Sequence, residues 1–211
     1  MRKIVKIQEP LSLTEHRSKS HSTYENYPDK DRLRISLVTE QRGICCYCMG
    51  EIQADESKMK IEHLHSQSGY PLEQLDYSNL FGACLGNMKT GTNTHCDTFK
   101  GNKDFNFHMC TSGNIHAAIK YKTNGEIYSD NINLNNELNS VLNLNLPELI
   151  KARKSTVEGF VKANISGKLG KLNKKQLIRF RDKWAGNLSS DSLQPFCMVV
   201  VSFLETKISK L

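Results

Sequence analysis

Between residues 60 and 102, the chain gathers side chains of the kinds that hydrolytic enzymes use. They are an acid followed directly by an imidazole, an amide, a second acid and an amine: Glu62, His63, Asn79, Asp97 and Lys100. Cleavage of a phosphodiester by water needs such a set, because the water must lose a proton and the charge that develops on the phosphate must be offset. This stretch therefore predicts metal-assisted phosphodiester cleavage.

The cysteines of the chain have the spacing of a metal site. Cys45 and Cys48 form a C-x-x-C pair that can grip one tetrahedral zinc ion, and Cys84 and Cys96 supply two further thiolates. Four thiolates make a closed site, so this zinc would be structural and would staple the surrounding segments together. Three of the seven cysteines remain as spares: Cys46, Cys110 and Cys197.

Two positions in this ligand set have alternatives. Cys46 can replace Cys45, although C-x-x-C is the better spacing. Eleven residues separate Cys84 from Cys96, so the segment between them must loop out, and His95 is the substitute for Cys96. The competing interpretation of these cysteines is a buried and inert set.

The composition describes a soluble protein with an anionic partner. The chain has 211 residues, a mean hydropathy of −0.51 and a formal net charge of +7, and no apolar run reaches membrane-spanning length. Residues 1–146 carry 16 basic and 17 acidic side chains, whereas residues 147–211 carry 13 and 5, so the excess charge lies in the last third. The start of the chain has no signal-peptide pattern, and we expect a cytoplasmic protein that does not enter membranes.

Periodicity and turn signals predict the elements that position the chemical residues. A helix over 29–41, stopped by Gly43, leads to the first cysteine pair, and a short strand over 59–64 carries Glu62 and His63. Residues 1–28 are expected to form a largely polar arm over the rest of the molecule.

The second half of the chain is predicted to be a hairpin followed by helices. Asn124-Gly125 predicts a type I′ turn, with both residues at positive φ, in a hairpin over 117–129. A helix begins near Pro147, and two more are expected over 172–185 and 196–208, although residues 198–204 also fit a buried strand. The expected organisation is an N-terminal arm and helix, a catalytic core with zinc knuckles, a hairpin extension and a basic helical region, over 1–44, 45–103, 104–135 and 136–211.

A basic stretch lies in the predicted C-terminal helices. Seven basic residues occur between Lys168 and Lys183, against Asp182 alone, and three of them are candidate phosphate contacts: Lys174, Lys175 and Arg179. A solvated helix face is the competing interpretation. No aromatic residues are interleaved in a way that indicates base stacking, so sequence-specific binding is not predicted.

The order of these residues resembles the HNH endonuclease family, in which two strands and a helix surround one divalent cation. Glu62-His63 matches the acid-histidine pair of that family, Asn79-Leu80 its asparagine followed by an apolar residue, and Asp97 the polar ligand that opens the helix. The resemblance covers roughly residues 43–102. It implies an α+β fold with a zinc-stapled ββα-metal core, flanking helices and a mainly helical C-terminal region.

A narrower resemblance is to the HNH subunit of the bacterial Septu anti-phage system, also found with some retrons (PtuB-like). It is carried by the segments R-G-I-C-C-Y-C, I-E-H-L-H-S-Q-S, N-L-F-G-A-C, H-C-D-T-F-K-G-N and V-L-N-L-N-L-P. This resemblance implies an SMC-like ATPase subunit as partner and a role in defence against phage.

The family resemblance also assigns roles to the residues. His63 would be the base that deprotonates water, Glu62 and Asp97 would hold Mg²⁺ or Mn²⁺, and Asn79 would hold the loop or orient the histidine. Lys100 can reach a phosphate, with a solvated lysine as the alternative. Many relatives have Asp at the position of Glu62 and Asn or His at that of Asp97, but these replacements keep ligands for a cation.

Other interpretations remain open at this point. His65 would face the same side of an extended strand as His63 and can be a second ligand, a substrate contact or simply exposed. The chain can also be a non-catalytic zinc-knuckle module that binds nucleic acid or protein. As a nuclease it would favour DNA, but the same fold can cleave RNA such as tRNA, because the chemistry neither requires nor excludes a 2′-hydroxyl.

Overall fold

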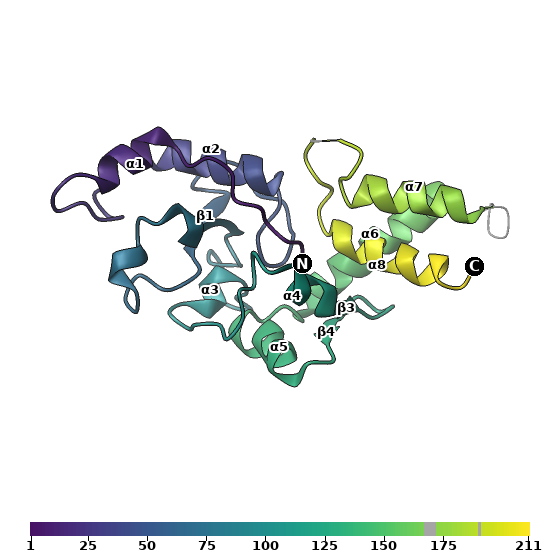
Figure 1. Cartoon of the computed structure of the whole chain (residues 1–211). Coiled ribbons are helices and arrows are strands. Elements are labelled where there is room, and N and C mark those ends of the chain that lie inside the picture. The colour runs from purple at the N-terminus through teal and green to yellow at the C-terminus, as the bar shows by residue number, and fades with distance from the viewer. Residues whose placement is uncertain (167–171, 190) are drawn as a thin grey trace.

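The computed structural model describes residues 1–166, 172–189 and 191–211. Within them the chain combines helices with two small sheets, an α+β arrangement (Figure 1). The helices are α1 (Leu11–Arg17), α2 (Lys30–Gln41), α3 (Asp97–Lys100), α4 (Gly113–Ala118), α5 (Ile132–Asn136), α6 (Pro147–Asn164), α7 (Lys174–Trp184) and α8 (Cys197–Ile208), with short turns η1 (Pro71–Glu73), η2 (Tyr77–Asn79) and η3 (Glu137–Val141).

Each sheet is an antiparallel pair of strands. The first joins β1 (Met59–His63) to β2 (Leu80–Cys84), with Met59 opposite Cys84 and His63 opposite Leu80. The second joins β3 (Ile119–Tyr121) to β4 (Ile127–Ser129). The short helix α3 follows the first sheet along the chain, which brings the predicted acid-histidine pair and the predicted second acid into one region of the fold.

Helix α2 is fastened to the first sheet by one amide side chain. The buried Gln41 accepts a hydrogen bond from the Gly82 N–H at 2.6 Å and donates to the carbonyl oxygens of Gly82, at 2.7 Å, and Ile44, at 2.9 Å. Gly82 permits this approach, because a Cβ there would lie 3.3 Å from Nε2 of Gln41, and it would also crowd Cδ1 of Ile52 at 2.8 Å. The helix ends as expected, with Arg42 in the left-handed conformation and Gly43 at φ +80°.

The N-terminal segment differs from the expected polar arm. Leu11–Arg17 forms helix α1, and Leu13 packs with Tyr27, Leu33 and Leu37 in a small apolar cluster under α2. With few apolar residues in the segment, no helical period was visible in the sequence. The packing of Leu13 on α2 stabilises a helix that is too short to form on its own.

The hairpin forms at the predicted residues but with a different turn. Gly125 has φ +98°, whereas Asn124 does not have a positive φ, and the pair Lys122/Glu126 closes a three-residue loop through a backbone hydrogen bond of 2.9 Å. This is the geometry of a turn followed by one left-handed glycine, in place of the predicted type I′ turn. A Cβ on Gly125 would lie 2.3 Å from the carbonyl oxygen of Ile150, so α6 reinforces the requirement for glycine.

The C-terminal helices follow the sequence closely. Helix α6 begins with Pro147 at its first position, and α7 begins with a capping box between Asn173 and Gln176. Residues 198–204 belong to helix α8, which excludes the strand alternative. The three helices pack around Phe160, which makes edge contacts with aromatic rings of α7 and α8: Phe180, Trp184 and Phe203.

The part of the fold around the first sheet and the group of C-terminal helices lie at opposite ends of the molecule in Figure 1. Elements α2, β1 and α3 are on the left, and α6, α7 and α8 are on the right. They are joined where Arg42 donates hydrogen bonds to three carbonyl oxygens of the segment that precedes α8: Gly186, Ser189 and Asp191. Among the described residues, no helix has the length and apolar character needed to cross a membrane.

Replacing Gly82 with alanine tests the close approach of α2 to the sheet. We expect Gly82→Ala to lower the free energy of unfolding by about 1–3 kcal/mol, because the added methyl overpacks a filled core. Urea unfolding followed by circular dichroism measures this value. Gly159→Ala is the control, since a Cβ there meets no atom within 4 Å and alanine favours the interior of α6. Equal stability of the two variants would contradict this account.

Candidate active site and metal centre

The sulfur atoms of four cysteines lie close together in the part of the fold around the first sheet. The Sγ atoms of Cys45, Cys48, Cys84 and Cys96 all lie within 4.8 Å of one another. Two of the separations are 3.7 Å, between Cys48 and Cys84, and 4.0 Å, between Cys45 and Cys96. A tetrahedral zinc ion with bonds of about 2.3 Å places its sulfur ligands about 3.8 Å apart. This group can therefore bind a metal such as zinc.

Backbone geometry brings the four sulfurs together from three segments. The first two cysteines lie in a tight knuckle, where the Cys45 N–H donates to the Gly50 carbonyl at 2.8 Å and Met49 has a positive φ. Cys84 ends β2, and Cys96 immediately precedes α3, with its N–H bonded to the Leu142 carbonyl at 2.9 Å. The sulfur cluster is thus the point at which the knuckle, the sheet and α3 are joined.

The segment between Cys84 and Cys96 loops out, as its length requires. The His95 N–H closes the loop by donating to the Gly86 carbonyl at 3.2 Å. A side chain at Gly86 would collide with the His95 carbonyl oxygen at 2.1 Å. Nδ1 of His95 lies 3.1 Å from the Cys96 sulfur, so this histidine borders the cluster, but four sulfurs are already gathered without it.

The remaining cysteines lie outside the four-sulfur group. Cys46, Cys110 and Cys197 are all buried, and none of them belongs to the cluster. Burial would raise the pKa of the Cys45 thiol, but hydrogen bonds from neighbouring thiols, among them Cys46 and Cys48, hold it well below its ordinary value. A thiolate at Cys45 is the form that a metal ion binds.

Two carboxyl groups face each other beside this cluster. Glu62 lies on β1 and is only 2% exposed, and Asp97 is the first residue of α3. Burial and the neighbouring Asp97 raise the pKa of Glu62 well above its usual value, although the Lys100 ammonium opposes the shift. Burial would also raise the pKa of Asp97, but the hydrogen bond with Glu62 and the Lys60 ammonium lower it. Glu62 therefore binds a proton more readily than an ordinary carboxyl group, whereas Asp97 releases one more readily.

Lys100 does not occupy the position expected from the sequence. Its side chain is 1% exposed, and its Nζ lies 3.0 Å from Oε1 of Glu62 and donates to the His63 carbonyl oxygen, also at 3.0 Å. The prediction that Lys100 contacts a substrate phosphate is corrected accordingly, because α3 turns this side chain into the interior. Its charge balances the buried carboxylate instead. Lys60 plays the same part for Asp97, with Nζ 3.0 Å from Oδ2.

His63 is held in a defined tautomer. Its Nε2 lies 3.0 Å from the Gln74 carbonyl oxygen, which can only accept, so Nε2 carries the proton. Nδ1 is then the accepting nitrogen, and it receives a hydrogen bond of 3.1 Å from the amide of Gln67. The ring of Tyr24 packs edge-on against the His63 ring, with 4.5 Å between the ring centroids. Burial lowers the pKa of His63, which favours the neutral base at neutral pH.

Asn79 organises the loop that follows His63. Its side chain accepts from the His65 N–H at 2.8 Å and donates to the His65 carbonyl at 3.0 Å. His65 itself is turned toward Glu73, to which Nδ1 donates at 2.7 Å, and its ring packs on Tyr70. Asn79 thus holds the loop geometry, and His65 contacts neither carboxylate of the pair.

His63 and the two carboxyl groups line a cleft of about 400 Å³ that is open to solvent. Its lining includes His63, Glu62 and Asp97, together with residues that sequence reasoning missed: Tyr24, Arg34, Lys60 and Gln67. Tyr24 and Arg34 come from the N-terminal region, far from the catalytic motif in the sequence. No spacing rule links them to it, because their approach depends on how α2 docks against β2.

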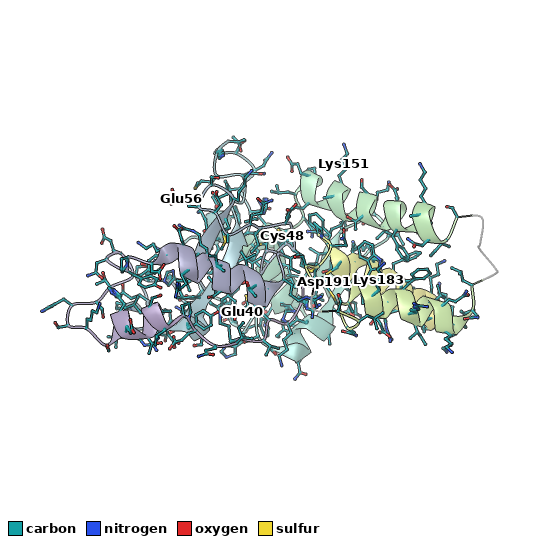
Figure 2. All side chains as sticks on the ribbon, turned by 90° about the horizontal axis from the view of Figure 1, so that it is seen from above. Glu40, Cys48, Glu56, Lys151, Lys183 and Asp191 are labelled. Carbon is teal, nitrogen blue, oxygen red and sulfur yellow. The ribbon has the colours of Figure 1, made fainter. Side chains whose placement is uncertain are left out.

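The basic residues of α7 lie apart from this cleft. Lys174, Lys175 and Arg179 are exposed on that helix, while Lys168 and Lys171 fall outside the described residues. Figure 2 shows the separation between Glu56, on the rim of the cleft, and Lys183, on α7. These side chains are not part of the lining of the cleft that contains His63.

Removing one cysteine of the group tests the metal centre. We expect Cys84→Ala to lose bound zinc and to unfold at lower temperature, because apparent zinc-binding energies of about 10 kcal/mol or more couple to folding in small zinc domains. Cys197→Ala is the control, since this buried cysteine lies outside the group. Elemental analysis and thermal denaturation, with and without chelator, measure both effects. Equal zinc content in the two variants would contradict the assignment.

Comparisons with known proteins agree with this geometry in part. No family model matches the chain. Over 80 residues it is 32% identical to a protein from Escherichia coli that is provisionally named the HNH endonuclease of retron Ec83. The match covers 33% of this chain and 31% of that protein, so the chain spans about a third of the length of this relative. This similarity, over part of each chain, supports an HNH family.

Proposed function

We propose that this protein is a metal-dependent HNH endonuclease that hydrolyses phosphodiester bonds in nucleic acid, with DNA as the favoured substrate. The observation that carries the proposal is the meeting of His63 and the Glu62/Asp97 pair in one cleft. The similarity to the retron protein supports the same family independently. In this proposal β1, β2 and α3 form the ββα-metal core.

The carboxyl pair suits a hard divalent cation. Mg²⁺ is commonly held by one or two carboxylates, with water and substrate phosphate completing its coordination. Glu62 and Asp97 would supply those carboxylates to Mg²⁺ or Mn²⁺. When bound, the cation supplies Lewis-acid stabilisation of charge on the phosphate. Lys60 must then yield its place beside Asp97, whereas Lys100 remains beneath Glu62.

His63 is suited to act as the general base. With Nε2 fixed on the Gln74 carbonyl, Nδ1 has the lone pair that removes a proton from water. The carbonyl also favours the imidazolium that forms, because the Nε2–H bond strengthens as the ring gains charge. Gln67 must release Nδ1 before a water molecule can donate to it. Asn79 would act at a distance, by holding the loop that carries Gln67.

The cysteine group has a different role in this proposal. A zinc ion with four thiolates has no open position, so it would hold the knuckle, β2 and α3 together without touching substrate. This arrangement fixes Asp97 relative to Glu62.

The biological setting that we propose is defence against phage. In this setting the protein would be an effector nuclease of the Septu or retron-associated (PtuB-like) kind, acting with an SMC-like ATPase subunit in the cytoplasm. The relative named for a retron supports the retron association alone. The basic surface of α7, with Lys174, Lys175 and Arg179, would contact nucleic acid outside the cleft.

Two other functions remain as outcomes of the test. A non-catalytic zinc-knuckle module would bind nucleic acid or protein without cleaving it, but it would not need the Glu62/Asp97 pair. The same fold can also cleave RNA such as tRNA, and assays on both DNA and RNA separate these substrates.

Replacing the base tests the proposal directly. We expect His63→Ala to lower the cleavage rate by about 10²- to 10⁴-fold, the usual contribution of a general base, while zinc content and thermal stability stay near those of the wild type. His108→Ala is the control, since His108 is exposed and does not line the cleft. The assay follows labelled DNA and total RNA with Mg²⁺ or Mn²⁺, with and without the ATPase. Equal cleavage by both variants would remove His63 as the base, and binding without cleavage by the wild type would favour the zinc-knuckle module.

A further inference from the structure

We propose that Arg34, on α2, binds a backbone phosphate of the nucleic acid in the cleft, and that Asp31 and Glu56 occupy its guanidinium until the substrate arrives. This inference rests on the proposed nuclease function and adds a substrate-binding residue from outside the catalytic motif.

The guanidinium of Arg34 is mostly buried, and only part of its hydrogen-bonding capacity is used. Its side chain lines the cleft and is 12% exposed, and its Nε is buried without a hydrogen-bond partner. One terminal nitrogen donates to Asp31 at 2.7 Å, and the other lies 3.6 Å from Glu56. Arginine presents its donors in a planar fork that matches the oxygens of a phosphate. The guanidinium of Arg34 therefore still has hydrogen-bond donors to offer to such a ligand.

The two acidic partners hold Arg34 weakly. The side chains of Asp31 and Glu56 are 86% and 83% exposed, so both carboxylates are largely hydrated. Ion pairs with exposed carboxylates contribute little, and salt screens them further. A phosphate that enters the cleft can therefore displace them, whereas the partly buried arginine stays in place.

The other cations near the cleft are committed to the carboxyl pair. Lys60 lies against Asp97 and Lys100 against Glu62, each at 3.0 Å. Among the described lining residues, Arg34 is thus the cation that is not paired with either of the proposed metal-binding acids. It can take a phosphate without disturbing the charge balance of that pair.

The position of Arg34 relative to His63 is set by contacts on both sides of α2. Gln41 fastens the end of the helix to Gly82, and Tyr24, from the segment before it, donates its N–H to the Gln74 side chain at 2.9 Å. The Gln74 carbonyl in turn holds His63. A phosphate on Arg34 would therefore have a defined place beside the base.

Binding of short labelled DNA, single- and double-stranded, to the zinc-loaded full chain tests the inference, in a His63→Ala background that prevents cleavage. Fluorescence anisotropy gives Kd over a series of salt concentrations. We expect Arg34→Gln to raise Kd about tenfold, as for loss of a charged hydrogen bond, and to reduce the slope of log Kd against log salt by about one. Glu56→Gln should lower Kd, because it removes a competing carboxylate, and Arg34→Lys should recover part of the binding.

Arg32→Gln is the matched control, because Arg32 lies on the same helix, pairs with Asp29 at 3.5 Å and does not line the cleft. Equal Kd and salt slope for Arg34→Gln and Arg32→Gln would overturn the inference and leave the nuclease proposal standing if the wild type cleaves. If Arg34→Gln fails to fold, the Glu56→Gln result decides, and an unchanged Kd there overturns the inference. A wild type that neither binds nor cleaves nucleic acid would overturn the nuclease function itself.

Discussion

The meeting of four cysteine sulfurs is the constraint on which the rest of the site depends. Cys45 and Cys48 lie in a knuckle, Cys84 at the end of β2 and Cys96 at the start of α3, so the group joins three segments that are separate in the sequence. A bound metal would join them with several kcal/mol of folding energy. Because Asp97 follows Cys96 directly, the position of Cys96 in this group also determines where the Asp97 carboxylate lies relative to Glu62.

Charge balance is the second constraint, and it connects the fold to the chemistry. Glu62 is buried and Asp97 is only partly exposed, and an unpaired charge at Glu62 would be strongly unfavourable. Three features of the site offset this cost: the raised pKa of Glu62, the buried ammonium of Lys100 and the more accessible ammonium of Lys60.

The sequence predicted the parts of the site that depend on local spacing. The cysteine pair and the strand with Glu62 and His63 follow from spacing and periodicity, and the helix that begins at Asp97 follows from the family resemblance. The inward turn of Lys100 was not predictable, because the direction of a lysine on a four-residue helix depends on what that helix packs against. Tyr24 and Arg34 were missed for a related reason, since only the docking of α2 through Gln41 brings them to the cleft.

The most direct test of this account is anomalous diffraction from crystals of the zinc-loaded protein soaked in Mn²⁺. We predict a zinc peak within the cysteine group and a separate manganese peak between Glu62 and Asp97, with Lys60 displaced from Asp97. A zinc peak alone, with Lys60 still paired to Asp97 at high Mn²⁺ concentration, would contradict the account and favour a zinc-stapled binding protein.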